Sequence, residues 1–174
     1  MTNSPCAVKA AAFVAGLLML LALPAPLRAE LKVKEVTPGV YYGNSPKSDS
    51  DYRELQVLGV KTVLDLRKFV SRRIATEQDC VPAYGMVYRQ VAMGFQPTRD
   101  CTPEPVLQIM HDPSQQPIYV HCGLGRDRTA LVAALYRVRY VGWTPEAAHA
   151  QMKSERFNRL LLDLDRYFSL YARP

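Results

Sequence analysis

The stretch Val120-His121-Cys122-Gly123-Leu124-Gly125-Arg126-Asp127-Arg128-Thr129 says more about the fold and its chemistry than any other part of the chain. The apolar run at 117–120 before it predicts a buried strand, and the run at 129–136 after it predicts a helix. A loop that connects a strand to a helix directs backbone N–H groups and the helix N-terminus at one point, which suits a tetrahedral oxyanion. We therefore expect this loop to bind phosphate.

Two side chains give the predicted loop its chemistry. Arg128 carries a planar fork that grips two phosphate oxygens at once, a geometry that lysine lacks. The same positive field favours thiolate over thiol at Cys122, so we expect its pKa to fall below the free value of about 8.5. Buried cysteines are usually inert, but the two loop glycines and the flanking strand and helix favour a nucleophile here.

His121, Cys122, Gly125, Arg128 and Thr129 match the His-Cys-x-x-Gly-x-x-Arg-Thr pattern of cysteine-dependent phosphatases, the protein-tyrosine and dual-specificity group. Stretches 40–46 and 62–67 resemble the early strands of small bacterial dual-specificity-like phosphatases, and 142–148 resembles the start of their late helix. The chain is most similar to small exported bacterial tyrosine phosphatases. The resemblance implies a phosphatase that needs no metal or organic cofactor.

The resemblance also implies roles for these residues. Cys122 would attack phosphorus to form a phosphocysteine, Arg128 would bind the phosphoryl oxygens, and Thr129 would assist release of the thiolate. His121 would orient the loop by hydrogen bonding rather than transfer a proton. The predicted phosphate-binding residues are Gly123, Leu124, Gly125, Arg126, Asp127 and Arg128.

Two charged loop residues each have two alternative roles. A carboxylate near phosphate repels it, so we expect Asp127 to face outward and brace the loop by pairing with a neighbouring arginine, with substrate contact as the alternative. Arg126 either contacts the substrate or lies solvated at the rim, and the sequence leaves both open.

The general acid departs from the family pattern. Dual-specificity phosphatases usually carry an aspartic acid well upstream of the cysteine, but 89–96 contains no acidic residue. Asp100, 22 residues before Cys122, is the nearest carboxylate in an expected loop, so we predict that it protonates the leaving group. Glu104 and Asp112 are the alternatives, although Glu104 suits the first turn of a helix and Asp112 suits a turn.

The first 29 residues predict an export signal. Lys9 precedes the uncharged apolar stretch 10–23, and 27–29 resembles a cleavage site, while a retained anchor is the alternative. The remaining 30–174 would form one phosphatase domain in the periplasm or outside the cell, with no stable membrane span. Cleavage leaves 20 basic and 16 acidic residues, a net charge of +4, which is too diffuse to indicate nucleic-acid binding.

Export also changes how the cysteines are interpreted. Cys6 leaves with the signal, so Cys80, Cys101 and Cys122 remain. An odd count in an oxidising compartment indicates one disulfide and one free thiol. Because Cys122 must stay reduced to act, we predict a Cys80–Cys101 bridge, with two separately buried thiols as the alternative.

Strand and helix patterns alternate along the chain, with strands at 60–66, 86–92 and 117–121 and helices at 102–111, 129–141 and 158–171. This order predicts an α/β fold with a mainly parallel sheet and helices on both faces. We expect a phosphatase that hydrolyses phosphotyrosine or phosphoserine/threonine in proteins. The alternatives are a phosphatase of small phosphorylated molecules such as inositol phosphates, and a phosphate-binding pseudophosphatase. The oligomeric state is not legible from the sequence.

Overall fold

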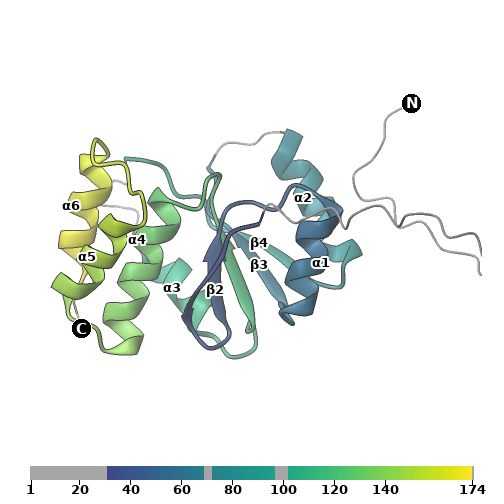
Figure 1. Cartoon of the computed structure of the whole chain (residues 1–174), viewed down its shortest axis with the longest axis horizontal. Helices are drawn as coiled ribbons and strands as arrows, with labels where there is room; N and C mark the ends of the chain where they lie inside the picture. Colours follow the sequence, from purple (N-terminus) through teal and green to yellow (C-terminus); the bar gives the residue numbers. More distant parts are fainter. Residues whose placement is uncertain (1–30, 69–71, 97–101, 174) are drawn as a thin grey trace, which may run out of the picture.

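A five-stranded sheet forms the centre of the computed structural model, which describes residues 31–68, 72–96 and 102–173 (Figure 1). The spatial order is β1-β2-β5-β3-β4, and only β1 runs antiparallel to its neighbour. The expected mainly parallel sheet is therefore confirmed. The strands are β1 Val33–Thr37, β2 Val40–Gly43, β3 Thr62–Asp65, β4 Val87–Gln90 and β5 Ile118–His121.

Helices cover both faces of the sheet. Figure 1 shows α1 and α2 on one face and the helices from α3 to α6 on the other. Within the described residues, no helix is both long and apolar enough to cross a membrane. The helices are α1 Asp49–Val57, α2 Arg72–Ala83, α3 Glu104–His111, α4 Asp127–Tyr136, η1 Arg137–Val141, α5 Pro145–Ser154 and α6 Leu162–Tyr171.

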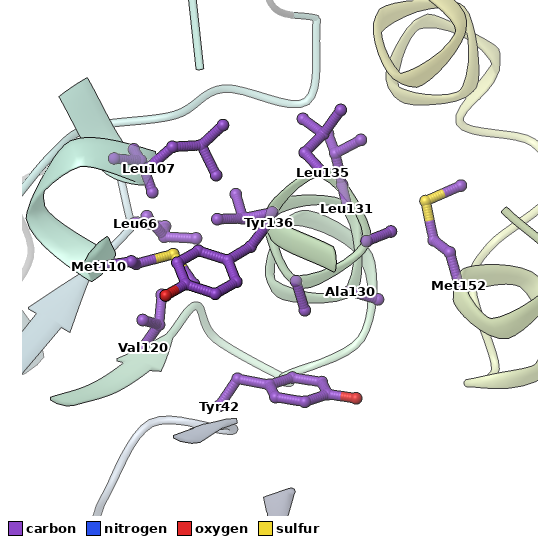
Figure 2. Packing of buried hydrophobic residues seen from close by; sticks show 14 of the residues in the cluster. Tyr42, Leu66, Leu107, Met110, Val120, Ala130, Leu131, Leu135, Tyr136 and Met152 are labelled. Carbon is purple, nitrogen blue, oxygen red and sulfur yellow. The ribbon is translucent and has the colours of Figure 1, made fainter. Parts of the chain in front are cut away.

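Strand alternation divides the buried side chains between two cores. Ile118 and Val120 of β5 pack with α4 in the larger cluster, whereas Tyr119, which lies between them, packs with α1 and α2. Figure 2 shows the larger cluster, with Leu131 of α4 completely buried at its centre. Burying a leucine of this kind stabilises the fold by roughly 1.5–3 kcal/mol, so α4 is held firmly against the sheet. That packing fixes the helix whose N-terminus faces the predicted phosphate.

Three predicted helices differ at their ends from the observed ones. The predicted 129–141 helix starts earlier, at Asp127, and its last turn widens into the π-helix η1. The predicted 102–111 helix starts later, at Glu104, with Pro103 as its N-cap residue and no side-chain cap bond. The last helix starts at Leu162 rather than 158, because the Leu160 N–H donates to the Asn158 side chain at 3.1 Å in a preceding turn.

Candidate active site

The predicted loop connects β5 to α4 and passes close to the end of β2. Gly125 has a φ of 67°, and a Cβ there would lie 2.3 Å from the Gly43 carbonyl carbon and 2.4 Å from the Asn44 nitrogen. Only glycine permits both this backbone conformation and this close approach. The glycine expected from the motif therefore has a steric reason, which is the contact with the β2 loop.

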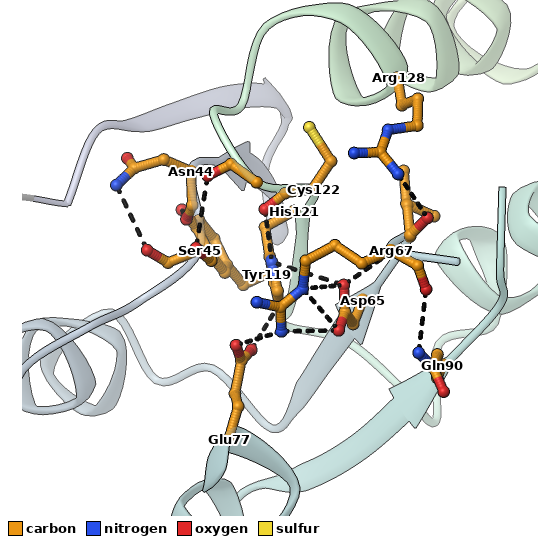
Figure 3. Close-up of polar contacts among 12 residues, drawn as sticks. Asn44, Ser45, Asp65, Arg67, Glu77, Gln90, Tyr119, His121, Cys122 and Arg128 are labelled. Atoms are coloured by element: carbon orange, nitrogen blue, oxygen red, sulfur yellow. Dashed lines mark hydrogen bonds and ion pairs between the residues drawn. The ribbon is translucent and has the colours of Figure 1, made fainter. Parts of the chain in front are cut away.

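The residues after β2, for which no sequence pattern predicted a role, brace the loop. The Ser45 N–H and hydroxyl both donate to the Gly123 carbonyl at 3.3 Å. The Tyr119 hydroxyl donates to the Asn44 carbonyl at 2.7 Å, and Asn44 Oδ1 accepts from the Lys32 N–H at 2.7 Å (Figure 3). These bonds fix the loop from the side opposite α4.

Cys122 lies at the end of β5 with only 3% of its surface exposed. Burial raises the pKa of its thiol, but the Thr129 hydroxyl, the Arg128 guanidinium and backbone N–H groups of Gly125 and Thr129 outweigh that and lower the pKa below its ordinary value. The lowered pKa agrees with the expectation drawn from the loop. A thiolate at this position is the reactive form of a cysteine nucleophile.

Arg128 is buried beside Cys122, as the motif requires (Figure 3). Its Nη1 donates to the Met93 carbonyl at 3.1 Å and more weakly to the Leu66 carbonyl at 3.4 Å. The Phe95 ring lies against the guanidinium, 4.2 Å from the ring centroid to Cζ. These contacts hold the arginine in place before any substrate binds. No sequence pattern predicted Phe95 at this position.

The Asp127 side chain is not outward-facing, which corrects the prediction. Asp127 is buried, and its Oδ1 accepts from the Asn158 N–H at 2.8 Å, while no arginine within the described part of the chain pairs with it. This bond ties the first residue of α4 to the turn before α6. The carboxylate is thus occupied by this contact, and a role of Asp127 in phosphate binding stays a prediction.

His121 anchors a buried network of charged side chains below the loop. Its Nδ1 lies 3.1 Å from the Cys122 carbonyl oxygen, and its Nε2 lies 2.6 Å from Glu77 Oε1. Arg67 donates to both carboxylates of the network, at 2.7 Å to Asp65 Oδ2 and at 2.6 Å to Glu77 Oε2 (Figure 3). The supporting role expected for His121 thus has a physical basis, since it holds the main chain of the nucleophile.

The network contains both cations and carboxylates. Burial lowers the pKa of His121, but Glu77 and Asp65 outweigh burial and raise it above its ordinary value, which favours the imidazolium. Asp65, Glu77 and His121 lie close enough together to suggest a metal site, yet Arg67 already supplies a cation between the two carboxylates. The arrangement is therefore that of an internal ion network, in which each buried charge has a partner.

The three candidate acids have different positions. Asp100 lies outside the described residues. Glu104 is the first residue of α3. Asp112 is the C-cap residue of α3 and lies before the first residue of β5, whereas Cys122 follows its last residue. The length of this strand therefore separates Asp112 from Cys122. That placement excludes Asp112 as the acid and leaves Asp100 and Glu104.

The cysteines differ in their oxidation state. Cys122 is a free thiol, whereas Cys80 in α2 is in a disulfide bond. Cys101, the partner predicted for Cys80, lies outside the described residues, so the pairing stays a prediction. The requirement that the nucleophile stay unpaired is met.

Comparisons with known proteins agree with this geometry. A family model described as "DSP-PTPase phosphatase fused to NAD+ Kinase" matches residues 32–164. No curated protein sequence matches the chain.

Among solved structures, TpbA from P. aeruginosa is 26% identical and has a TM-score of 0.64, over 80% of this chain and 82% of that one. The catalytic core of the PP-IP phosphatase SIW14 from S. cerevisiae is 18% identical with a TM-score of 0.60, over 80% and 84%. A putative phosphatase from Shewanella putrefaciens is 18% identical with a TM-score of 0.65, over 80% and 87%. At this level of identity, the last two likenesses concern the fold.

Proposed function

The chain belongs to the DSP-PTPase family of phosphatases, and from that premise we propose that it hydrolyses phosphate monoesters through a phosphocysteine. The observation that carries the proposal is the buried Cys122 thiol with a lowered pKa beside Arg128, at the N-terminus of α4. A thiolate and a guanidinium held together in this way provide a nucleophile and an oxyanion site.

The proposed reaction has two displacements at phosphorus. In the first, the Cys122 thiolate forms an S–P bond while the ester P–O bond breaks, and Asp100 gives its proton to the leaving oxygen. In the second, water attacks phosphorus, the S–P bond breaks, and Asp100 takes up the proton of the water. Arg128 and the loop N–H groups stabilise the charge on the phosphoryl oxygens in both steps. Thr129 stabilises the departing thiolate.

Turnover of p-nitrophenyl phosphate tests the proposal, because its leaving group scarcely needs an acid. We expect the parent protein to hydrolyse it and Cys122→Ser to lose essentially all turnover while still binding phosphate. A phosphoenzyme trapped by rapid acid quench should be absent from Cys122→Ser. Retained turnover in that variant overturns the mechanism. A parent protein that binds phosphate without turnover would instead be the pseudophosphatase.

We propose phosphotyrosine or phosphoserine/threonine in proteins as the substrate. A variant of TpbA was solved in complex with phosphotyrosine, at 23% identity to this chain, which supports testing that ester first. A panel of phosphotyrosine and phosphoserine peptides, compared with inositol phosphates by kcat/KM, separates proteins from small molecules as substrates. A preference of tenfold or more for inositol phosphates, about 1.4 kcal/mol in transition-state binding, would select the alternative.

We also propose that the protein is exported, with 1–29 as its signal peptide and the periplasm or the exterior as its location. The disulfide bond at Cys80 supports this, because structural disulfides persist in oxidising compartments. The test is N-terminal sequencing of the protein from fractionated cells. A mature chain that begins at Glu30 in the periplasmic fraction is expected, and an uncleaved chain in the membrane fraction would select the retained anchor.

A further inference from the structure

A cavity of about 500 Å³ lies at the opposite end of α4 from the phosphate-binding loop. The loop precedes α4, whereas the cavity is lined by Arg139 of η1, which follows α4, and by the end of α6. The ten residues of α4 span about 15 Å, and Figure 1 shows the end of α6 near the lower end of this helix. The cavity is therefore separate from the site of the proposed reaction.

The lining of this cavity combines two cations with apolar surface. Arg139 and Arg173 come from different segments, and both are exposed. Leu170 is 45% exposed, and the Tyr171 ring packs on Tyr167 with 4.6 Å between the ring centroids. Within the described part of the chain, the lining contains no acidic residue and no carboxylate pairs with either arginine. The cavity thus offers two cations beside apolar side chains, as the binding of an anionic amphiphile requires.

Arg139 belongs to the π-helix η1, and such turns are rare and occur often at functional sites. Arg137 at the start of η1 is buried and donates to the Tyr42 hydroxyl at 3.2 Å, whereas Arg139 is exposed. The long aliphatic stem of an arginine can lie along an apolar surface while its guanidinium reaches a charged group. The π-helix therefore holds one arginine in the interior and presents another at the cavity.

Two further apolar side chains are exposed at the same end of α4. Val141, the last residue of η1, is 38% exposed, and Trp143 is 39% exposed. The tryptophan ring is apolar with one polar edge, and tryptophan is enriched where proteins meet the surface of a membrane. An acidic peptide would need only the arginines. Exposed tryptophan and leucine beside arginines match a lipid, which has acyl chains as well as a charged head group.

We infer that this end of the molecule docks on an anionic phospholipid membrane, with a lipid head group bound by Arg139 and Arg173. The acyl chains would lie against Leu170 and Tyr171. Interfacial binding of this kind needs no membrane span, because it relies on apolar contacts and on the attraction of cations to anionic lipids. Docking at this end directs the phosphate-binding loop away from the bilayer and leaves it open to substrate. The inference does not depend on the proposed phosphatase reaction.

The first experiment titrates dissolved short-chain lipids into the full chain by calorimetry. Dihexanoyl phosphatidylglycerol is anionic, and dihexanoyl phosphatidylcholine has the same chains without net charge. The second experiment measures binding to vesicles of phosphatidylcholine alone and of equal parts phosphatidylcholine and phosphatidylglycerol. We expect tighter binding to the anionic lipid in both, with the difference shrinking as salt rises. The apolar stretch 10–23 can bind vesicles itself, so each variant is compared with the parent full chain, which carries the same stretch.

Arg139→Gln and Arg173→Gln are the decisive variants, because both side chains are exposed and the fold should tolerate their loss. Each should weaken binding to the anionic lipid about fivefold, and the double variant about 30-fold, since one arginine near an anionic membrane contributes a factor of about five. Arg159→Gln is the matched control. It removes an exposed arginine before the first residue of α6, at the other end of that helix from the cavity, and should bind like the parent.

Three outcomes overturn the inference: no preference for phosphatidylglycerol, a preference that survives the double variant, or the same loss in Arg159→Gln. Two further probes identify other occupants. If the double variant weakens binding of a hexaglutamate peptide but leaves lipid binding unchanged, the partner is an acidic protein segment and the lipid assignment is wrong. If glycerol 3-phosphate, a head group without chains, depends on the two arginines as strongly as the dissolved lipid and binds as tightly, the cavity binds a free phosphate ester instead.

Discussion

Replacing Thr129 with valine tests how the fold activates Cys122. Thr129 is 1% exposed, and its hydroxyl is the foremost of the groups that lower the pKa of the Cys122 thiol. Valine keeps the shape of threonine and removes only the donor. Because the Thr129 hydroxyl lowers the pKa of Cys122, Thr129→Val should raise that pKa. The pH dependence of thiolate reactivity should move to higher pH.

The size of the effect follows from the hydrogen bond that is lost. A hydrogen bond to a charged group contributes about 1.5–3 kcal/mol, which corresponds to roughly a 10- to 100-fold smaller thiolate fraction at a pH below both pKa values. The fold itself should tolerate the change, because a buried hydroxyl without an oxygen or nitrogen partner adds little stability. The loss of reactivity should therefore appear without a lower Tm.

The assay is alkylation of Cys122 by iodoacetamide between pH 4 and 9, followed by mass spectrometry. Dividing each rate by its own plateau at high pH removes differences in intrinsic nucleophilicity between the thiolates. Thr129→Ser, which keeps the hydroxyl, is the control and should follow the parent. If the valine and serine variants share the parent's midpoint, the hydroxyl does not stabilise the thiolate and the reasoning fails.

The remaining predictions concern the arginine, the acid and the buried network. Arg128→Lys should lower kcat by about 100-fold or more while the protein stays folded, because an ammonium cannot replace the fork that binds two oxygens; a mild effect on p-nitrophenyl phosphate turnover would contradict this. Asp100→Asn should slow hydrolysis about 10²–10⁴-fold for basic leaving groups and much less for p-nitrophenolate. Rates for a series of aryl phosphates, measured for Asp100→Asn and for Glu104→Gln, identify the acid as the residue whose replacement makes the rate depend steeply on leaving-group basicity. Glu77→Gln should lower the free energy of unfolding by about 3–5 kcal/mol, because it leaves buried charge uncompensated, as urea unfolding can measure. The pKa of His121 is raised in the folded protein, so the His121 imidazolium stabilises the fold fully below about pH 6.5, and this stabilisation is lost as pH rises through the folded pKa. The free energy of unfolding of the parent should therefore fall over this pH range, and that of Glu77→Gln should not.

The sequence predicted the loop and the sheet because both depend on local patterns. Cys122 and Arg128 flank a glycine-containing turn between an apolar strand and a helix, and neighbouring residues alone specify that unit. The fold class followed from the alternation of strands and helices. Helix ends were less predictable. Arg137, the first residue of the π-helix at Arg137–Val141, is buried and donates to the Tyr42 hydroxyl at 3.2 Å, a contact with another element that no local pattern shows.

The buried network shows what a single sequence leaves out. Asp65 pairs in register with His121 on adjacent parallel strands, and both lie on the face where Val63 and Tyr119 are buried. A carboxylate on a buried face requires a cation, so strand alternation marked Asp65 as a residue needing a partner. Strand order and register, however, were needed to bring His121 beside it. Glu77 comes from a polar-looking helix, and no local pattern connects it to β5.

At the end of β5, the two faces of the sheet carry separate parts of the proposed chemistry. His121 and Cys122 are consecutive residues, so extended backbone directs their side chains to opposite faces of the sheet. On the α2 side, His121 and Glu77 belong to a closed ion network that holds the Cys122 carbonyl. On the α4 side lie Cys122 and Arg128, the nucleophile and the oxyanion-binding group of the proposed reaction. The charges of the network on the α2 side neutralise one another within the protein. The positive charge of Arg128 on the α4 side stays available to phosphate. Placing both sets on one face would let Glu77 compete with phosphate for Arg128, so the alternation of β5 is itself a requirement of the site.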